Sequence, residues 1–288
     1  MNKIILSCLI ALNTQQALAD NWFQDTPLQA TYSALMAKNT PLAWQELQLA
    51  LNQNNLDERY WSQIKKQILL QSHCGKTLSE TPSTAAQSHI RLTIQKKSNL
   101  LQQGYQFKIS LDDTQEKVFI SFSDNQGTVL FSGYSSSLDN SYSELEGGDM
   151  ISAPTPGLYQ LRINKKNYPV ILSSHRSVNW INLENTHSLH QIQISPPQQQ
   201  QDCPLTSPQW QWFDKNYTLL GSIEPMSYIE PISSHSTQQS TAVVDLPYAP
   251  SIGAKWISAV ISRSEYQGQV RVNYSQRLTL PTVMKTNR

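Results

Sequence analysis

The pattern of hydrophobic and polar positions changes along the chain from a helical period to an alternating one. Over residues 20–76, apolar residues recur three and four positions apart, which is the spacing of one helix face. Thr26 and Thr40 are each followed by proline, a pair typical of helix starts. A third apolar face runs over residues 56–70. We therefore predict a small helical domain of three short amphipathic helices.

The apolar faces of these helices are predicted to require burial against other structure. The small residues Ala30, Ala34, Ala43 and Ala50, with the aromatics between them, resemble a single tetratricopeptide-like helix pair. Such pairs bury their faces only by stacking on adjacent structure. We expect the helical domain to dock on the rest of the protein or on a partner.

An alternating pattern follows a predicted linker over residues 77–88, which lacks any apolar period. Alternation of apolar and polar residues is the period of a half-buried strand. A Pro156-Gly157 turn leads into Tyr-x-Leu-x-Ile and resembles the late strands of immunoglobulin-like sandwiches in bacterial envelope proteins. We predict a first β-sandwich over residues 89–175. Its alternating apolar residues include Ile90, Leu92, Ile94, Phe107, Ile109, Leu111, Val118, Ile120, Phe122, Val129 and Phe131.

More short strands are predicted after residue 176, on both sides of an extended glutamine-rich segment at 195–201. Their spacing, with turn residues between them, is typical of another sandwich over residues 176–288. The expected fold is mainly β, with two immunoglobulin-like sandwiches and a small helical cap. The predicted strand segments are 178–181, 189–192, 210–213, 219–220, 242–244, 256–260 and 270–272.

The first nineteen residues have the layout of a cleaved export signal. Lys3 precedes an apolar stretch at 4–12, and Ala17-Leu18-Ala19 gives the small-x-small exit. We predict cleavage between Ala19 and Asp20 and a periplasmic location. A lipid anchor on Cys8 is the alternative, but it would leave almost no apolar core ahead of the cysteine. The apolar stretch is about half of the roughly 20 residues that span a bilayer, and no other segment approaches that length.

Two cysteines, Cys74 and Cys203, remain after the predicted cleavage. In an oxidising compartment they are expected to form one disulfide, closing a loop worth roughly 4 to 5 kcal/mol in the chain-entropy model. Two free thiols or pairing with another chain are the alternatives. Neither cysteine lies in a Cys-x-x-Cys unit, so a redox-catalytic role is not expected.

Charge excludes some classes of partner. Charged residues make up 15% of the chain, and loss of Lys3 leaves 21 basic residues, which match its 21 acidic ones. A formally neutral chain has no field to attract nucleic acid or an anionic membrane surface. Low charge with many Ser, Thr, Gln and Asn residues favours a β-rich exported protein.

No catalytic, cofactor or metal site is predicted. His187 and His190 flank a predicted strand, where residues three apart face opposite sides. The Ser-His pairs beginning at Ser174 and Ser234 lie outside a nucleophile-elbow context. Carboxylates that were weighed for calcium binding or glycoside hydrolysis lie at predicted turns, where Asp and Asn are favoured for backbone reasons. These carboxylates are in Asp112-Asp113, Asp124-Asn125, Asp139-Asn140, Glu144, Glu146 and Asp149.

Trp210 and Trp212 alternate on a predicted strand and therefore share a face. If that face is exposed, the two indoles form a stacking platform for a sugar ring or an apolar partner group. If it is buried, they belong to the sandwich core, which is the interpretation that we favour.

Several segments together resemble a family of uncharacterised exported proteins of γ-proteobacteria. They are residues 21–28, the helices around Trp44 and Trp61, and the strand at 210–213. The resemblance implies no activity and no catalytic residues. The family's association with operons of two-component envelope sensors implies a periplasmic accessory role.

The leading hypothesis is a non-enzymatic periplasmic interaction protein that supports envelope or cell-wall stress signalling, with an envelope protein as its partner. A carbohydrate- or peptidoglycan-binding module that uses exposed tryptophans is the main alternative. A hydrolase whose site is assembled from distant residues is a third.

Overall fold

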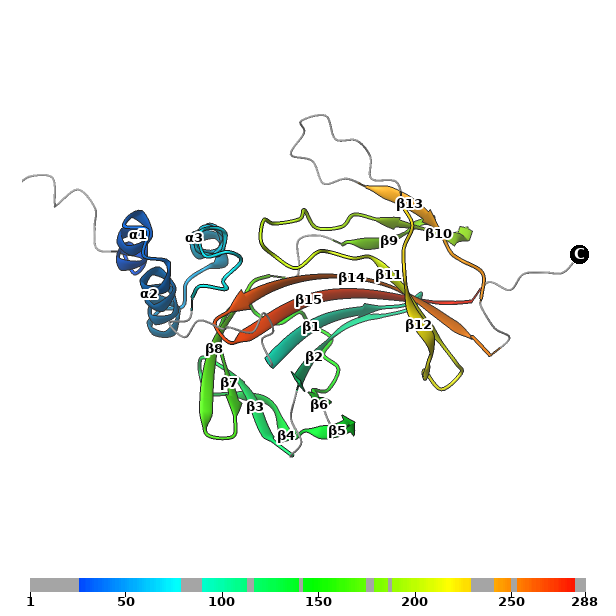
Figure 1. The fold of residues 1–288 in the computed structure, drawn as a ribbon, viewed down its shortest axis with the longest axis horizontal. Helices are drawn as coiled ribbons and strands as arrows, with labels where there is room; N and C mark the ends of the chain where they lie inside the picture. The colour runs from blue at the N-terminus through cyan, green and yellow to red at the C-terminus, as the bar shows by residue number, and fades with distance from the viewer. Residues whose placement is uncertain are drawn as a thin grey trace, which may run out of the picture.

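The computed structural model describes residues 26–78, 90–112, 117–139, 142–174, 179–185, 188–228, 241–249 and 253–282. The predicted export signal with its cleavage point, and residues 79–88 of the predicted linker, lie outside these ranges. Within them, three helices precede fifteen strands (Figure 1). No described helix has the length and apolar character needed to cross a membrane.

The three predicted helices are present: α1 (Gln29–Met36), α2 (Thr40–Gln53) and α3 (Glu58–Gln71). The cap of α2 is Asn39, one residue before the predicted Thr40, because its side chain accepts a hydrogen bond of 3.2 Å from the Leu42 N–H. The Asp57 side chain caps α3 in the same way, at 2.9 Å from the Arg59 N–H.

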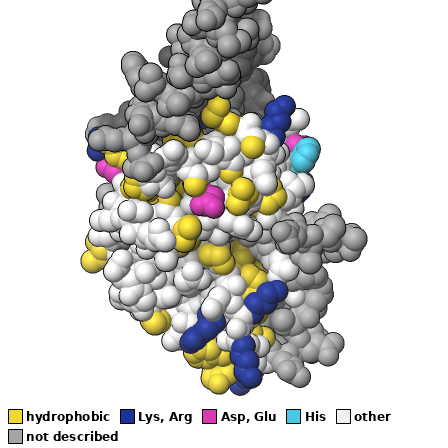
Figure 2. Space-filling model, turned by 90° about the vertical axis from the view of Figure 1, so that its left-hand side faces the viewer, with side chains coloured by type: hydrophobic (Ala, Val, Ile, Leu, Met, Phe, Trp, Pro, Cys, Tyr) yellow, Lys and Arg dark blue, Asp and Glu magenta, His cyan; other side chains and the backbone are white. Residues whose placement is uncertain are grey.

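The helices dock on the β-structure, as predicted from their unsatisfied apolar faces. Trp44 and Leu47 of α2 and Trp61 of α3 share a hydrophobic core with Leu158 and Ile171, which come from two strands. The opposite side of the helices keeps apolar side chains in solvent, and Figure 2 views this side, where hydrophobic atoms form separate patches on a mostly polar surface. The exposed large apolar residues of the helices are Tyr32, Met36, Leu42, Leu49, Tyr60 and Leu70.

A central eight-stranded sheet organises the β-structure, in the order β12-β11-β14-β15-β1-β2-β6-β5 (Figure 1). Its longest strands, β14 and β15, have twelve residues each and extend well beyond the predicted segments. The bounds are β1 (Ile90–Ser98), β2 (Gln103–Asp112), β5 (Ser136–Asp139), β6 (Tyr142–Glu146), β11 (Gln209–Phe213), β12 (Leu219–Pro225), β14 (Trp256–Gln267) and β15 (Val270–Pro281).

Two smaller sheets complete the structure. One has the order β4-β3-β7-β8 and lies beside the helices, and the other has the order β13-β10-β9. The bounds are β3 (Phe119–Asp124), β4 (Val129–Tyr134), β7 (Gly157–Ile163), β8 (Lys166–Leu172), β9 (Ile181–Asn185), β10 (Ser188–Ile194) and β13 (Ala242–Asp245).

The predicted division into two sandwiches at residues 175 and 176 is corrected by the strand pairing. β1 runs parallel to β15, with Ile90 opposite Val270 and Ser98 opposite Leu278. The central sheet therefore contains strands from both predicted sandwiches. Alternating apolar positions identify a strand but do not say which distant strand pairs with it, and the sequence-based division relied on order along the chain alone.

A single main core joins the three sheets. Leu92 of β1, Val272 of β15 and Ile257 of β14 share it with Phe122 of the four-stranded sheet and Ile192 of the three-stranded sheet. All of these side chains are essentially inaccessible to solvent. The described strands between residues 90 and 282 thus form one β-structure, with the helices packed on one end of it.

Candidate functional site

Trp210 and Trp212 are buried, which confirms the interpretation that we favour over an exposed aromatic platform. Trp210 and Trp212 lie in β11 with exposed fractions of 4% and 1%. They pair in register with Ala259 and Ile257 of the neighbouring strand β14 and belong to the main core. This burial removes the carbohydrate-binding site that was the alternative for these two residues.

The carboxylates considered for glycoside hydrolysis already pair with lysine side chains. Lys108 pairs with Glu144 and, at 3.4 Å, with Glu146. Asp149 lies 3.0 Å from Lys97. This arrangement of carboxylates neutralised by lysines differs from the paired acid and nucleophile of a glycosidase.

The residues considered as calcium or histidine metal ligands form no metal-binding cluster within the described part of the chain. The Oδ1 atom of Asp124 accepts hydrogen bonds from the N–H groups of Gln126 and Thr128, at 2.9 and 2.8 Å, as in an Asx turn. Asp112 lies 3.7 Å from Arg91. Among the described residues, no three His, Cys, Asp or Glu side chains are grouped to hold a metal ion. Candidate positions outside those residues are Asp113, Asn140, His175, His187, Ser234 and His235, together with the side chains of Asp139 and His190.

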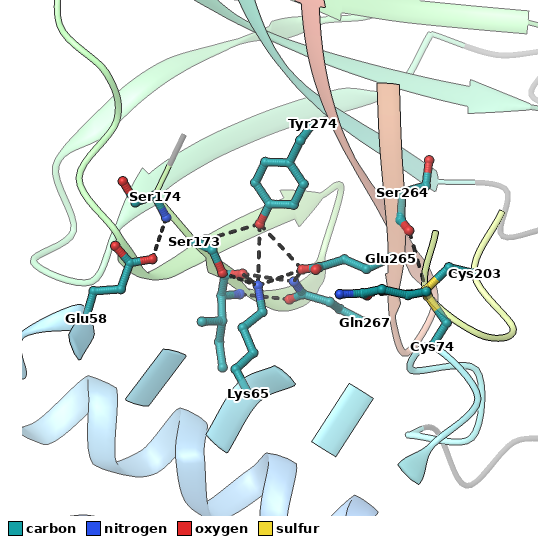
Figure 3. A network of polar contacts seen from close by, with 12 residues as sticks. Glu58, Lys65, Cys74, Ser173, Ser174, Cys203, Ser264, Glu265, Gln267 and Tyr274 are labelled. Carbon is teal, nitrogen blue, oxygen red and sulfur yellow. Dashed lines mark hydrogen bonds and ion pairs between the residues drawn. A yellow bond between two sulfur atoms is a disulfide. The ribbon is translucent and has the colours of Figure 1, made fainter. Parts of the chain in front are cut away.

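A buried polar network lies where α3 meets the β-structure (Figure 3). Lys65 Nζ forms an ion pair with Glu265 Oε1 at 2.6 Å. It also donates hydrogen bonds to the Ile171 carbonyl at 2.9 Å and to Ser173 Oγ at 2.8 Å. The side chains of Lys65 and Glu265 are only 2% and 6% exposed. These contacts use all three N–H bonds of the ammonium group. We call Lys65, Ser173, Glu265, Gln267 and Tyr274 the Lys65 network.

Gln267 and Tyr274 complete the network. The Gln267 side-chain amide accepts from the Ile171 N–H at 2.8 Å and donates to the Ile171 carbonyl at 2.9 Å. The same Nε2 atom donates to Glu265 at 2.7 Å. The Tyr274 hydroxyl accepts from the Ser173 N–H at 3.1 Å. Glu265, Gln267 and Tyr274, on β14 and β15, are thereby fixed to β8 and to α3.

The network holds both members of its ion pair charged. Burial opposes ionisation of Glu265, but Lys65 and Arg263 outweigh burial and lower the pKa of the carboxyl. Burial likewise opposes the charge on Lys65, but Glu265 outweighs it and raises the pKa of the ammonium. Burial and the Glu265 charge raise the pKa of Tyr274, which stays protonated. With its groups enclosed and paired, the network positions the helices and offers no reacting atom to a ligand.

The predicted disulfide between Cys74 and Cys203 is present in the structure, with Cα atoms 5.1 Å apart (Figure 3). It joins the turn after α3 to the segment that leads into β11. In the same turn, Gly75 has a φ of +84°, and an added Cβ would lie 1.8 Å from the Tyr266 carbonyl oxygen. The Cys74 carbonyl accepts a hydrogen bond of 2.9 Å from the Tyr266 N–H. The helical unit is thus clamped covalently and by close backbone contact.

An open cleft of about 690 Å³ lies at the edge of this clamped junction. One wall is the α2–α3 connection, a second is the β3–β4 turn, and a third is the segment between β6 and β7. Phe107 and Tyr159 line it but are almost fully buried, whereas Leu130 and Ile151 contribute exposed apolar side chains. We call this volume the seam cleft. Its lining residues are Leu51, Asn54, Asn55, Leu56, Phe107, Asp124, Asn125, Leu130, 149–156, Gly157, Leu158 and Tyr159.

The walls of the seam cleft are held together by direct hydrogen bonds. The Tyr159 hydroxyl donates to the Thr155 carbonyl at 2.6 Å. Burial, with a contribution from Asp124, raises the pKa of Tyr159 to about 12, so the hydroxyl keeps the proton that it donates. The Asn125 side chain donates to the Leu51 carbonyl at 3.4 Å, a long contact that links the β3–β4 turn to α2. The cleft is therefore largely formed without a ligand.

Sequence reasoning did not identify either feature. The cue for the Lys65 network was a lysine between Ile64 and Ile68 on the apolar face of a helix. A charge at a core position requires a partner, but nothing in the sequence pointed to Glu265. The cue for the cleft was Ile151 in a short polar segment with Pro154 and Pro156, a weak pattern that many loops share.

The family model described as "Protein of unknown function (DUF2861)" matches residues 22–283. No curated protein matches the chain.

Three solved structures show low similarity to the chain. "Biofilm associated protein - BSP domain" is 10% identical with a TM-score of 0.22, over 69% of this chain and 30% of that one. A tetra-tandem repeat in the extending region of a large adhesion protein is 11% identical with a TM-score of 0.18, over 66% and 49%. Bovine butyrophilin is 12% identical with a TM-score of 0.19, over 67% and 99%. Similarities at this level support no conclusion about the function of the chain.

Proposed function

The chain belongs to the DUF2861 family of proteins of unknown function, and we propose that it is an exported, non-enzymatic protein that binds an envelope component through the seam cleft. The layout of residues 1–19 supports export, and the Cys74–Cys203 disulfide is consistent with an oxidising compartment. The resemblance to exported γ-proteobacterial proteins from envelope-sensor operons supports a periplasmic accessory role in envelope or cell-wall stress signalling.

The observation that carries the proposal is the preformed seam cleft. Its volume of about 690 Å³ falls within the usual range of ligand sites, roughly 300–1,000 Å³. The disulfide and the Lys65 network fix the helical wall to the β-structure. A site whose walls are already ordered loses little conformational freedom on binding, which favours affinity.

The groups that line the cleft favour binding over catalysis. They are amides, hydroxyls, apolar side chains and the carboxylates of Asp124 and Asp149. Asp124 uses Oδ1 to hold its own turn, and Asp149 pairs with Lys97. The Tyr159 hydroxyl is committed to Thr155. Catalysis requires a nucleophile or base that is free to meet a substrate.

Photo-crosslinking in cells tests the proposal. A photoreactive amino acid at Ile151, which is 92% exposed, should join the protein to a specific envelope component that mass spectrometry identifies. The same probe at Leu205, which is 83% exposed and lies in the segment before β11, outside the lining of the cleft, is the matched control.

The expected product depends on the cleft as well as on the probe. Leu130→Asp, combined with the Ile151 probe, should abolish the adduct while purified protein keeps its unfolding midpoint. Products shared by the Ile151 and Leu205 probes, with none specific to Ile151, would refute the proposal.

A further inference from the structure

The edge of β4 is unusually open to pairing. Val129, Leu130 and Tyr134 are 55%, 40% and 67% exposed. Within the described part of the chain, the β4 backbone forms its hydrogen bonds with β3. Residues 126–138 contain no charged residue and no proline. Proteins normally protect exposed edges with such residues, because unpaired N–H and C=O groups recruit other chains.

The other edges of the described sheets carry that protection. Each of these strands contains a charged residue, and two of them also contain proline. In the sequence, these residues are Glu224 and Pro225 in β12, Asp139 in β5, Asp245 in β13, Glu184 in β9, and Lys166 and Pro169 in β8. The contrast singles out β4 as the edge left able to accept a strand.

The β4 edge is continuous with the seam cleft. Ser123 of β3 pairs with Val129, and Phe122 pairs with Phe131, so Leu130 is the extra residue of a bulge. Bulges redirect a side chain and occur often beside binding sites. Leu130 lines the seam cleft together with Ile151. A chain that follows the β4 edge reaches an apolar opening at the point where the regular ladder ends.

We infer that β4 and the seam cleft form one peptide-binding site, in which an extended segment of a partner protein adds a strand to β4. An apolar side chain of that segment enters the cleft between Leu130 and Ile151. This inference rests on the proposed function and gives the chemical class of its ligand. Main-chain hydrogen bonds supply part of the affinity in strand addition, and side-chain pockets supply specificity.

Charge and length select the peptide. The cleft lining includes the carboxylates of Asp124 and Asp149 and no Lys, Arg or His. Lys97 offsets Asp149, so the site favours a neutral or basic segment over an acidic one. β4 has six residues and its ladder is interrupted at Leu130, which is too short and irregular for a stable edge-to-edge contact with a second copy. A short peptide anchored in the cleft fits these limits.

Selection from a random heptapeptide phage library tests the inference on the disulfide-bonded protein. Enriched sequences should contain alternating apolar residues, should be neutral or basic, and should lack central proline. Ile151→Asp should remove the enrichment, and Leu205→Asp, at a similarly exposed site outside the cleft lining, should leave it intact. Absence of enrichment over Ile151→Asp, or enrichment of acidic or proline-rich sequences, would overturn the inference.

Fluorescence anisotropy with one enriched peptide tests strand addition itself. An N-methylated twin that cannot donate backbone hydrogen bonds, and the Ser132→Lys protein, should each bind about tenfold more weakly, as expected for one or two lost hydrogen bonds. Equal binding of the methylated twin, or a dimer that Ser132→Lys dissociates, would contradict it. A persistent Ile151 crosslink in cells with no peptide enrichment would leave the proposed function standing and remove only the peptide.

Discussion

Lys65 is the residue on which the junction depends. It lies on the buried face of α3, and although it is charged, its side chain is as enclosed as the apolar side chains around it. Replacing an entire buried ion pair with apolar groups is often tolerated, whereas removing one partner leaves an uncompensated charge. The Lys65–Glu265 pair therefore tells us more about orientation of the helices than about net stability.

Lys65→Met is expected to lower the free energy of unfolding by about 3–5 kcal/mol, because Glu265 is left buried without its counter-ion. Urea unfolding followed by tryptophan fluorescence measures this change. The double variant Lys65→Met with Glu265→Leu should regain much of the loss. Arg59→Ala, which breaks the exposed Arg59–Asp57 pair, is the control and should have little effect. A Lys65→Met effect no larger than that of Arg59→Ala would contradict this account.

The Lys65–Glu265 pair predicts a range of pH over which its contribution to the free energy of unfolding is constant. The pKa of Glu265 is lowered from 4.5, so the unfolded chain takes up a proton first as the solution becomes acidic. The contribution of Glu265 is complete above pH 4.5 and is lost as pH falls through its folded pKa. The pKa of Lys65 is raised from 10.5, so its contribution is complete below that value and is lost as pH rises through its folded pKa. Urea titrations across this range should show a weaker acid loss in Glu265→Gln than in the native protein.

At the scale of elements, the turn after α3 sets the distance between the helices and β14. His73, Cys74 and Gly75 all have positive φ values, of 51°, 61° and 84°. This tight turn brings the backbone of Gly75 against Tyr266 and places Cys74 for its disulfide. Few residues other than glycine tolerate both the conformation and the contact.

Gly75→Ala is expected to destabilise the protein more than Gly127→Ala. Both glycines have positive φ, which costs a side chain about 1–2 kcal/mol. Only at Gly75 would the new methyl group also meet backbone, at 1.8 Å, whereas nothing lies within 4 Å at Gly127. Differential scanning calorimetry of the two variants isolates the contact. Equal shifts in midpoint would mean that the Tyr266 approach is unimportant.

Elements with a clear period could be predicted from the sequence. The three helices and strands such as β1, β2 and β11 follow directly from apolar spacing. β5 and β6 were missed, because Ser136–Asp139 and Tyr142–Glu146 are short and mostly polar and their pairing comes from neighbours. Pairing partners were also out of reach, since Ile90 gives no local indication of Val270.

The candidate site depended on the same non-local information. The disulfide could be predicted because the expected cleavage after Ala19 leaves only two cysteines. The seam cleft joins segments around Leu51, Asp124 and Ile151 that are far apart in the sequence. None of these residues carries a motif, so only the folded arrangement brings the site together.

At the scale of the whole molecule, the central sheet makes residues 26–282 interdependent. A fragment of residues 26–175 keeps β1 but loses β15, leaving the apolar face of Ile90, Leu92 and Ile94 without its neighbour. It also loses Glu265 and Cys203. We expect the fragment to lack near-ultraviolet circular dichroism and dispersed NMR resonances, in contrast to the chain of residues 26–282. Cooperative unfolding of the fragment would contradict this expectation and would support two independently folding sandwiches.

The parallel pairing of β1 with β15 also determines how long β1 waits for its partner strand during synthesis. At roughly 5–20 residues per second, residues 270–281 emerge on the order of ten seconds or more after β1. During that interval β1 has β2 on one side and no strand on the other. Sheets built from such distant pairings fold slowly. The edge of β1 that β15 covers in the folded protein is therefore open to other chains until the last long strand arrives.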